Sequence, residues 1–296
     1  MKLNQLRYFD AICRCGTMTE ASRQLHVAQP SLSASVRQLE EEYRINLFHH
    51  VGKKLTLTRE GERFLGWTRE VLKKVSDLED AAYDLSHRKN RVLLGVPPMI
   101  GSFLFPAVFA EFHRAHPEVE LVLYEQNSQE ICRLLIEEQL ELGMTLLDDV
   151  DTSAFCTHRL YTTQLCCCVH PNHPLAGRNA VSLQEIAEER VVLLQGRQYH
   201  IDQLHARYEQ EGIQPDIILR SSQLTTLKAL VETGEAVSFL FRETIRPEES
   251  IVPIPLEPSL RMKIGTVYKR GHYLYHDVVT LRNFIHKMYS DGGLVE

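Results

Sequence analysis

The N-terminal part of the chain contains short amphipathic helical patterns joined by a connection of only three residues. Apolar side chains recur at helical spacing over 6–13 and again over 21–25. The connection His26-Val27-Ala28 is too short for anything except a tight turn, and a third pattern begins immediately at Gln29. Pro30 suits the first turn of that third helix, where its missing N–H costs no hydrogen bond. We therefore expect three helices around one buried seam, the second and third forming a helix-turn-helix.

The start of the second helix of such a motif faces base edges in the DNA major groove. Gln29, Pro30, Ser31 and Ser33 are therefore the candidate base readers, with Arg37 one turn further along. A glutamine can form two hydrogen bonds with adenine, and a proline offers an apolar face to a thymine methyl. The alternative is that Gln29 and Ser31 only start the helix.

The stretch 49–58 favours two short strands around a Gly-Lys-Lys tip, which is typical of a β wing. Lys53 and Lys54 at this tip are candidates for contact with phosphate or the minor groove, and His50 lies beside them in the sequence. The alternative is that the two lysines are only solvated charges.

Thr58 is placed to cap a long helix that carries an apolar heptad seam over roughly three repeats. The helix is polar elsewhere, so we expect it to pair with a second copy of the chain rather than pack on the chain's own core. The seam consists of Phe64, Thr68, Val71, Val75, Leu78, Ala82 and Leu85.

The distribution of charge supports this division of the chain. The total of 33 basic and 39 acidic residues gives a net charge of −6, which by itself argues against a nucleic-acid partner. Residues 1–60, however, hold nine basic and six acidic side chains, about +3, which leaves about −9 for the remainder. Only the N-terminal segment is therefore suited to phosphate contact.

From Arg91 onwards, short apolar strands alternate with helices, a pattern that indicates α/β architecture with mainly parallel strands. Some 200 residues of this kind are enough for two subdomains, so the 296 residues should form two or three folding units. The expected strands are Val92–Val96, Val119–Tyr124, Leu140–Leu147, Leu165–Val169, Val191–Leu194, Ile217–Leu219, Val237–Phe241 and Lys263–Val267.

Four stretches in the N-terminal part form one pattern: the run from Ala21 to Ser33, Leu39-Glu40, Leu47-Phe48, and the run from Leu55 to Gly61. With this pattern the chain resembles the LysR-type transcriptional regulators. The C-terminal resemblance rests mainly on the order and spacing of Gly95 to Pro106, Phe112 to Pro117, His173-Pro174-Leu175 and Val231 to Val237.

The resemblance implies a winged helix-turn-helix over 1–60, a dimerising linker helix over 61–89 and a two-lobed effector domain like a periplasmic binding protein. The first lobe would comprise 90–161 and 265–296, and the second would be an insertion over 162–264. The implied function is transcription regulation by a homodimer or homotetramer that binds an interrupted palindrome in double-stranded DNA. A small-molecule effector would control it, and RNA polymerase is a further candidate partner.

The sequence departs from the pattern of that family at Ala34, at His49-His50 and at Arg44. Ala34 stands where an arginine is frequent, and His49-His50 replace a frequent basic residue. Arg44 replaces a frequent glycine, which affects the turn before Leu47. We therefore expect fewer direct contacts to DNA and a larger contribution of DNA shape to specificity.

Open α/β lobes bind ligands at the carboxyl ends of strands, where helix N-termini offer unpaired N–H groups. The candidate effector-binding residues at three such junctions are Pro98, Met99, Ser102, Ser128, Gln195 and Tyr199. The resemblance assigns to Ser128 the hydroxyl that often holds a ligand carboxylate, whereas Pro98 stands where a serine or threonine is common. The effector is thus expected to be anionic or partly apolar, although Ser102 and Ser128 could equally be plain helix caps.

Several other functions have weaker support. Cys166-Cys167-Cys168 raises the alternative of a thiol-based redox sensor, but consecutive strand residues alternate between faces and buried cysteine behaves as a small hydrophobe. No zinc-like spacing of cysteine and histidine occurs, and no catalytic motif, so we expect no metal, no cofactor and no enzyme. The N-terminal DNA module argues against a plain cytoplasmic binding protein. Without a signal peptide or an apolar run long enough to cross a membrane, a cytoplasmic location is expected.

Overall fold

The computed structural model describes residues 1–51, 54–86 and 89–290. Only the backbone is described for His50, Val51, Lys54, Ser86 and Ser290. The chain divides into two compact units, Met1–His87 and Arg88–Glu296.

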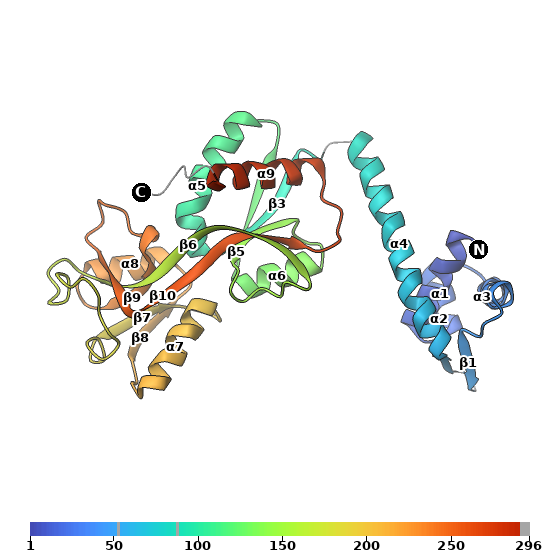
Figure 1. The fold of residues 1–296 in the computed structure, drawn as a ribbon, viewed down its shortest axis with the longest axis horizontal. Coiled ribbons are helices and arrows are strands. Elements are labelled where there is room, and N and C mark those ends of the chain that lie inside the picture. The colour runs from blue at the N-terminus through green and yellow to red at the C-terminus, as the bar shows by residue number, and fades with distance from the viewer. Residues whose placement is uncertain (52–53, 87–88, 291–296) are drawn as a thin grey trace. The chain divides into compact units, whose positions relative to one another are not determined.

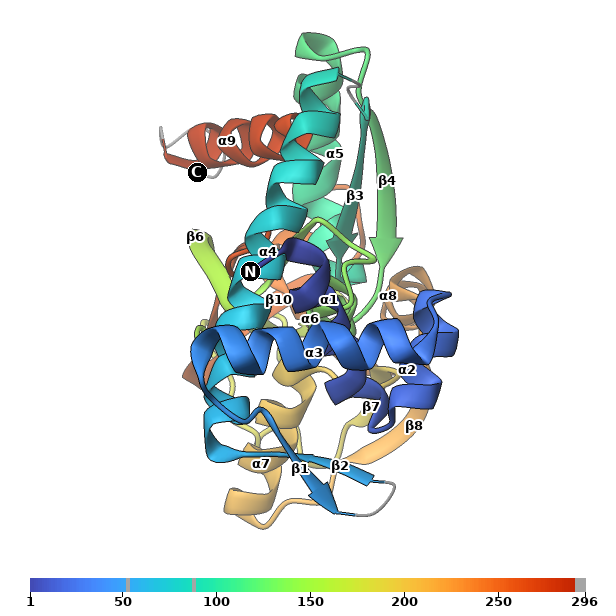
Figure 2. The same cartoon turned by 90° about the vertical axis from the view of Figure 1, so that its right-hand side faces the viewer.

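The N-terminal unit has the predicted order of helices and wing. Its elements are α1 (Leu3–Cys15), α2 (Met18–Leu25), α3 (Gln29–Tyr43), β1 (Phe48–Val51), β2 (Lys54–Leu57) and α4 (Arg59–Ser86). Helix α3 begins at Gln29 with a proline in its first turn, as predicted. Figure 2 shows the antiparallel strands β1 and β2 as a ribbon that projects beside α3.

The apolar seam of these helices forms a separate small core. Leu32, Val36 and Leu39 of α3 are buried against Phe9 of α1. The ring of Phe9 also makes an edge-to-face contact with Phe48 at the start of the wing, with ring centroids 5.4 Å apart. Such aromatic pairs stabilise a fold beyond the area they bury. Together these contacts hold α3 and the wing in fixed positions.

Thr58 caps α4, as predicted. Its hydroxyl oxygen accepts a hydrogen bond from the backbone N–H of Gly61 at 2.9 Å, and the hydroxyl donates to the carbonyl of Asn46 at 2.5 Å. One buried side chain therefore starts the long helix and ties it to the segment that precedes the wing.

The C-terminal unit is built on one mixed sheet with helices on both faces. Within the described residues the sheet has eight strands, in the order β4-β3-β5-β10-β6-β9-β7-β8. Figure 1 shows α9 and α6 on opposite sides of the strands at one end of this unit. The elements at that end are β3 (Arg91–Val96), α5 (Pro98–Ala115), β4 (Glu120–Glu125), α6 (Ser128–Ile136), β5 (Leu142–Leu146) and α9 (His276–Ser290). Those at the other end are β7 (Arg190–Leu194), α7 (Tyr199–Glu211), β8 (Asp216–Ser221), α8 (Leu224–Glu232), β9 (Val237–Phe241) and the short helix η1 (Arg242–Thr244).

Two long strands, β6 (Phe155–Val169) and β10 (Val252–Lys269), run through both ends of the unit (Figure 1). The sequence predicted only one short piece of each, because the crossing segments are polar and partly exposed rather than continuously apolar. Both strands pair antiparallel with each other, so the sheet is mixed and less parallel than expected. The expected boundaries of the second lobe lie opposite each other in this ladder, where Tyr161 pairs with Ile264.

Within the described part of the chain, no helix combines the length and the apolar character needed to cross a lipid bilayer.

Candidate nucleic-acid interface and effector cleft

One face of α3 is free of the core and carries most of the predicted base readers. Gln29, Pro30, Ser31 and Arg37 are exposed. Ser33 is half-buried, because it lies closer to the buried side of the helix, so its access to a groove is reduced. This exposed start of a helix offers polar and apolar groups in the arrangement that major-groove reading requires.

The connection between α2 and α3 adopts the conformation that a short turn needs. His26 ends α2 in the left-handed region with φ 53°, and the N–H of Val27 donates to the carbonyl of Ser22 at 3.1 Å. The Thr19 hydroxyl donates to the side-chain oxygen of Gln29 at 3.5 Å, a long contact that DNA can replace.

Arg37 differs from the neighbouring arginines in its electrostatic environment. Arg23 pairs with Glu20 at 3.4 Å, and Arg14 pairs with Asp10 at 2.9 Å. Arg37 forms no ion pair with any residue in the described ranges. Its full positive charge is therefore available to a phosphate.

Sequence reasoning did not choose Ala34 as a contact residue, yet it is exposed one helical turn after Pro30. Helical periodicity alone could have placed it on that face. Its methyl group offers apolar contact in place of the arginine expected there.

The wing residues are only partly described. Lys53 lies outside the described residues, and the side chains of His50 and Lys54 are likewise not described. The backbone of His50 pairs with Leu55, and that of His49, whose side chain is exposed, pairs with Thr56.

Arg44 takes the left-handed conformation that the family's frequent glycine would provide, with φ 54° and ψ 43°. The turn before Leu47 therefore keeps its path despite the substitution. A side chain in this region costs about 1–2 kcal/mol of backbone strain.

The linker helix α4 leaves most of its predicted seam exposed. Val71 is 43 % exposed, Leu78 67 % and Leu85 90 %. Large apolar side chains at a spacing of seven residues are typical of a helix that pairs with a second helix. They are exposed in the single chain and would be covered in the pair. Val75 is half-buried on the same stripe.

Phe64 was predicted to lie in the dimer seam, but its side chain packs within the N-terminal unit. Its ring packs on Phe9 with centroids 5.6 Å apart, and on Tyr43 at 5.9 Å. Phe64 therefore contributes to the core of the N-terminal unit, since the first turns of α4 pack on α1.

In the C-terminal unit, a small cleft lies where the first turns of three helices meet. Met99 of α5, Ser128 of α6 and Tyr199 of α7, three of the predicted effector residues, line it. In general, the start of a helix favours a bound anion through its unpaired N–H groups and positive dipole end. The cleft's internal space of about 10 Å³ is room for about one water molecule.

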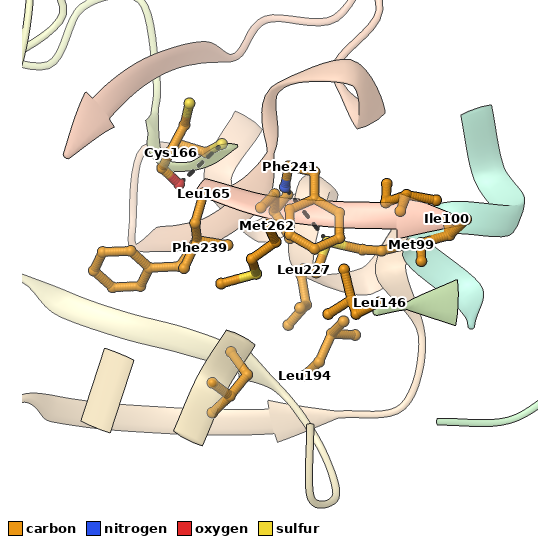
Figure 3. Close-up of a cluster of buried hydrophobic side chains, with 14 of the residues drawn as sticks. Met99, Ile100, Leu146, Leu165, Cys166, Leu194, Leu227, Phe239, Phe241 and Met262 are labelled. Atoms are coloured by element: carbon orange, nitrogen blue, oxygen red, sulfur yellow. Dashed lines mark hydrogen bonds between the residues drawn. The ribbon is translucent and has the colours of Figure 1, made fainter. Parts of the chain in front are cut away.

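Apolar side chains form the rest of the wall. Ile100, Leu146 and Phe241 line the cleft, and Figure 3 shows them close together. Pro97 and Gln198, which precede α5 and α7, complete the lining. The wall of the cleft is therefore mainly apolar, with a few polar side chains.

Three predicted effector residues do not line this cleft and are corrected. The Ser102 hydroxyl donates to the carbonyl of Met99 at 2.8 Å, and its side chain is exposed on α5. Pro98 is half-buried in the first turn of α5, and the proline that faces the cleft is Pro97. Gln195 is exposed, and its N–H donates to Ser221 at 2.8 Å.

His200, which sequence reasoning missed, lines the cleft beside Tyr199. It is 3 % exposed, and its ring lies 5.1 Å from that of Phe241. Burial lowers the pKa of His200 to about 3, so the ring is neutral near pH 7. The only available signal was its position in the first turn of a helix that follows a buried strand.

Cys13, Cys132 and Cys166 do not resemble activated thiols. Each is a free thiol in the described residues, which include all of them. Burial raises the pKa of Cys166 and of Cys132 to about 11, and burial together with the Asp10 carboxylate raises that of Cys13 to about 12. Since the thiolate is the reactive form, these thiols react slowly near pH 7.

Comparison with known proteins gives matches to both parts of the chain. Residues 3–62 match the bacterial regulatory helix-turn-helix protein family of lysR type, and residues 86–290 match the LysR substrate binding domain. The first match extends from α1 to the beginning of α4. The second covers the C-terminal unit, which contains the cleft.

Individual relatives match over almost the whole chain. The DNA-binding transcriptional dual regulator OxyR of Escherichia coli (strain K12) is 26 % identical over 276 residues, 92 % of this chain and 90 % of that protein. The RuBisCO operon transcriptional regulator of Allochromatium vinosum is 27 % identical over 297 residues, 96 % and 95 % of the two chains. The structure of HinK, a LysR family transcriptional regulator from Pseudomonas aeruginosa, aligns with a TM-score of 0.59 at 25 % identity, covering 97 % of this chain and 98 % of that one.

Proposed function

The chain belongs to the LysR family of bacterial transcriptional regulators, and we propose that it reads an interrupted palindrome in DNA through the first turn of α3. As a member, it is a DNA-binding regulator with an effector-binding domain. The observation that carries the proposal is the exposed start of α3, where Gln29, Pro30 and Ser31 stand free of the core while Arg37 remains unpaired by other described residues.

Paired half-sites follow from the exposed stripe on α4. If Val71, Leu78 and Leu85 are covered by the same stripe of a second copy, two α3 helices are presented together. A symmetric dimer then requires inverted half-sites about 34 Å apart, or at multiples of that spacing. We propose a homodimer that assembles further into a homotetramer, with RNA polymerase as a partner at the promoter.

The small molecule that controls the regulator is proposed to bind in the cleft at the starts of α5, α6 and α7. Ser128 and Tyr199 supply polar contacts, and Ile100, Leu146 and Phe241 supply apolar ones. A ligand there would contact elements from both ends of the long strands β6 and β10. Its binding would therefore change how the two lobes are held together.

A thiol-based sensor is the weaker candidate. Its support is the similarity to OxyR and the presence of seven cysteines. Against it, burial keeps Cys132 and Cys166 protonated, and no cysteine is among the residues that line the cleft in the described structure. Hydrogen peroxide that changed neither the free-thiol count nor DNA binding would eliminate this candidate.

Selection from a pool of randomised duplexes tests the DNA-binding proposal without assuming an operator sequence. The full chain should enrich duplexes that contain two inverted half-sites, and excess nonspecific DNA should not displace them. Enrichment of single, unpaired sites, or no enrichment above the starting pool, would contradict the proposal. A Leu78→Lys variant provides the control, since it keeps α3 intact and should enrich paired sites poorly.

A further inference from the structure

Glu40, in the last turn of α3, holds the segment that leads from this helix into the wing. Its side-chain oxygen Oε1 accepts a hydrogen bond from the backbone N–H of Leu47 at 2.7 Å and a longer one from that of Phe48 at 3.4 Å. The Glu40 side chain is half-buried, and those of Leu47 and Phe48 are buried. One carboxylate of α3 therefore binds two successive backbone donors at the start of β1 (Figure 2).

The helix itself does not explain a carboxylate at this position. The C-terminal end of a helix carries partial negative charge, so acidic side chains are favoured at the opposite end. The last turn of α3 nevertheless holds Glu40, Glu41 and Glu42 and no basic residue. Glu42 pairs with the N-terminal ammonium group of Met1 at 2.7 Å, and Glu40 has the two N–H groups. The bonds that Glu40 makes to the wing offset the unfavourable dipole.

The start of α4 holds the same segment from the other side. The Thr58 hydroxyl donates to the carbonyl of Asn46 at 2.5 Å, and the Thr58 N–H donates to the carbonyl of Leu47 at 3.0 Å. The first turn of α4 lies so close that a Cβ on Gly61 would clash with this second carbonyl oxygen. The backbone from Asn46 to Phe48 is therefore fixed between α3 and α4.

The wing depends on such anchors for its position. Strands β1 and β2 have four residues each and, in the described structure, pair only with each other. A two-stranded hairpin is at best marginally stable by itself in water. Phe48 pairs with Leu57 at the base of the wing, and its ring packs on Phe9. The direction of the wing is thus set at Phe48, by this packing and by the bond to Glu40.

We propose that Glu40 is a positioning residue for DNA binding, which fixes the wing relative to α3 through the N–H groups of Leu47 and Phe48 so that both elements reach the same stretch of DNA. This inference rests on the proposed DNA reading by α3 and on the expected phosphate contacts of the wing. A wing that is already in place loses little freedom on binding, which increases affinity. Phosphate contacts carry no sequence information, so their loss should weaken binding to all duplexes alike.

Two substitutions separate the hydrogen bonds of Glu40 from its charge. Glu40→Gln removes the charge but keeps an acceptor oxygen at full reach, and Oε1 alone accepts both bonds. Glu40→Asp keeps the charge but is one methylene shorter, so its oxygens fall short of the two N–H groups. Glu40→Gln should therefore behave like the unchanged protein, and Glu40→Asp should be impaired. Glu40 is not part of the apolar core of this unit, so the shorter side chain should leave the fold intact.

Binding of the full-length protein to DNA at several salt concentrations measures the number of phosphate contacts. The logarithm of the binding constant falls linearly with the logarithm of the salt concentration, with a slope of about −0.9 per phosphate contact. We expect Glu40→Asp to reduce the magnitude of this slope by at least about 0.9, for a selected and for a scrambled duplex, and to change the ratio of the two dissociation constants less than about twofold. Partial unfolding would lower the active concentration but leave the slope unchanged.

Glu41→Asp provides the matched control, because it makes the same truncation at the exposed neighbour, which forms no ion pair with any described residue. Its slope should equal that of the unchanged protein. An unaltered slope in Glu40→Asp, or a slope in Glu40→Gln as low as that in Glu40→Asp, would overturn the proposal. Equal binding of both duplexes by the unchanged protein would instead contradict base reading by α3, and the salt slopes would still decide the role of Glu40.

Discussion

The backbone N–H of Phe241 donates a hydrogen bond to the thioether sulfur of Met99 at 3.4 Å (Figure 3). Met99 lies in the first turn of α5, and Phe241 ends β9 at the other end of the long strands. Sulfur is a weak acceptor, so this contact holds the two lobes together with little energy. Both residues line the proposed effector cleft, so this contact lies at its wall.

Shortening Met99 should weaken the effector unit chiefly through lost packing. Met99 is 1 % exposed, so we expect Met99→Ala to lower the free energy of unfolding by about 2–5 kcal/mol. Met99→Leu keeps the volume, loses the sulfur acceptor and should cost less than about 1.5 kcal/mol. Urea unfolding followed by circular dichroism measures both. Equal losses for the two variants would show that the sulfur, not the packing, dominates.

Removing the cap of α4 should destabilise the N-terminal unit. Thr58→Ala removes the acceptor for the Gly61 N–H, and the expected loss is about 1–2 kcal/mol. Thr58→Ser keeps the hydroxyl and should lose much less. Trp67 is the only tryptophan in the sequence and lies on α4, so its fluorescence reports this unit selectively. If the unfolding midpoint of Thr58→Ala in urea equalled that of the unchanged protein, the assigned cap would be wrong.

A charge within the exposed stripe of α4 should separate the proposed dimer. Leu78 is 67 % exposed in the single chain and would be covered by the partner helix. We expect Leu78→Lys to shift the protein toward the monomer in sedimentation experiments, because a buried lysine would lack a counter-charge. Lys73 lies off the stripe, so Lys73→Glu serves as the control. If Leu78→Lys sedimented like the unchanged protein, α4 would not be the dimer contact.

Stability should fall at alkaline pH because of the buried thiols. Burial raises the pKa of Cys166 from 9.0 to about 11, so the folded state holds its proton after the unfolded state has lost it. The stabilisation is fully present below about pH 9 and is lost between about pH 9 and 11, at about 1.4 kcal/mol per pH unit.

Comparing unfolding of the unchanged protein with that of Cys166→Ala isolates this contribution from other groups that titrate in the same range. Between about pH 9 and 11, the free energy of unfolding of the variant should fall less than that of the unchanged protein. Parallel curves would mean that Cys166 ionises as readily in the folded state as in the unfolded one.

The N-terminal unit could be predicted almost completely, because its contacts are local. Leu32, Val36 and Leu39 mark the buried face of α3 by spacing alone, and Thr58 precedes the helix that it caps. Phe64 shows the limit. A heptad pattern marks which side chains are apolar, but packing on Phe9 decides which of them the chain itself buries.

The effector cleft was harder, because residues distant in the sequence form it. Strand ends located the three helix starts, and two residues predicted there, Ser128 and Tyr199, line the proposed cleft. Side-chain direction within a first helical turn decides between Ser102, which points outward, and Met99, which points inward. His200 carries no sequence signal that separates a buried, unpartnered ring from an exposed one.

The central claim is that Gln29 at the start of α3 reads bases, and one ratio tests it most directly. The dissociation constants for a selected duplex and for a scrambled duplex are measured at one salt concentration by fluorescence anisotropy. The ratio is the dissociation constant for the scrambled duplex divided by that for the selected duplex. Gln24→Ala is the matched control, since Gln24 lies on α2 and its side-chain oxygen accepts from the Cys15 thiol. We predict that Gln29→Ala reduces the ratio at least about tenfold, whereas Gln24→Ala leaves it unchanged. A ratio for Gln29→Ala equal to that of the unchanged protein would contradict the account.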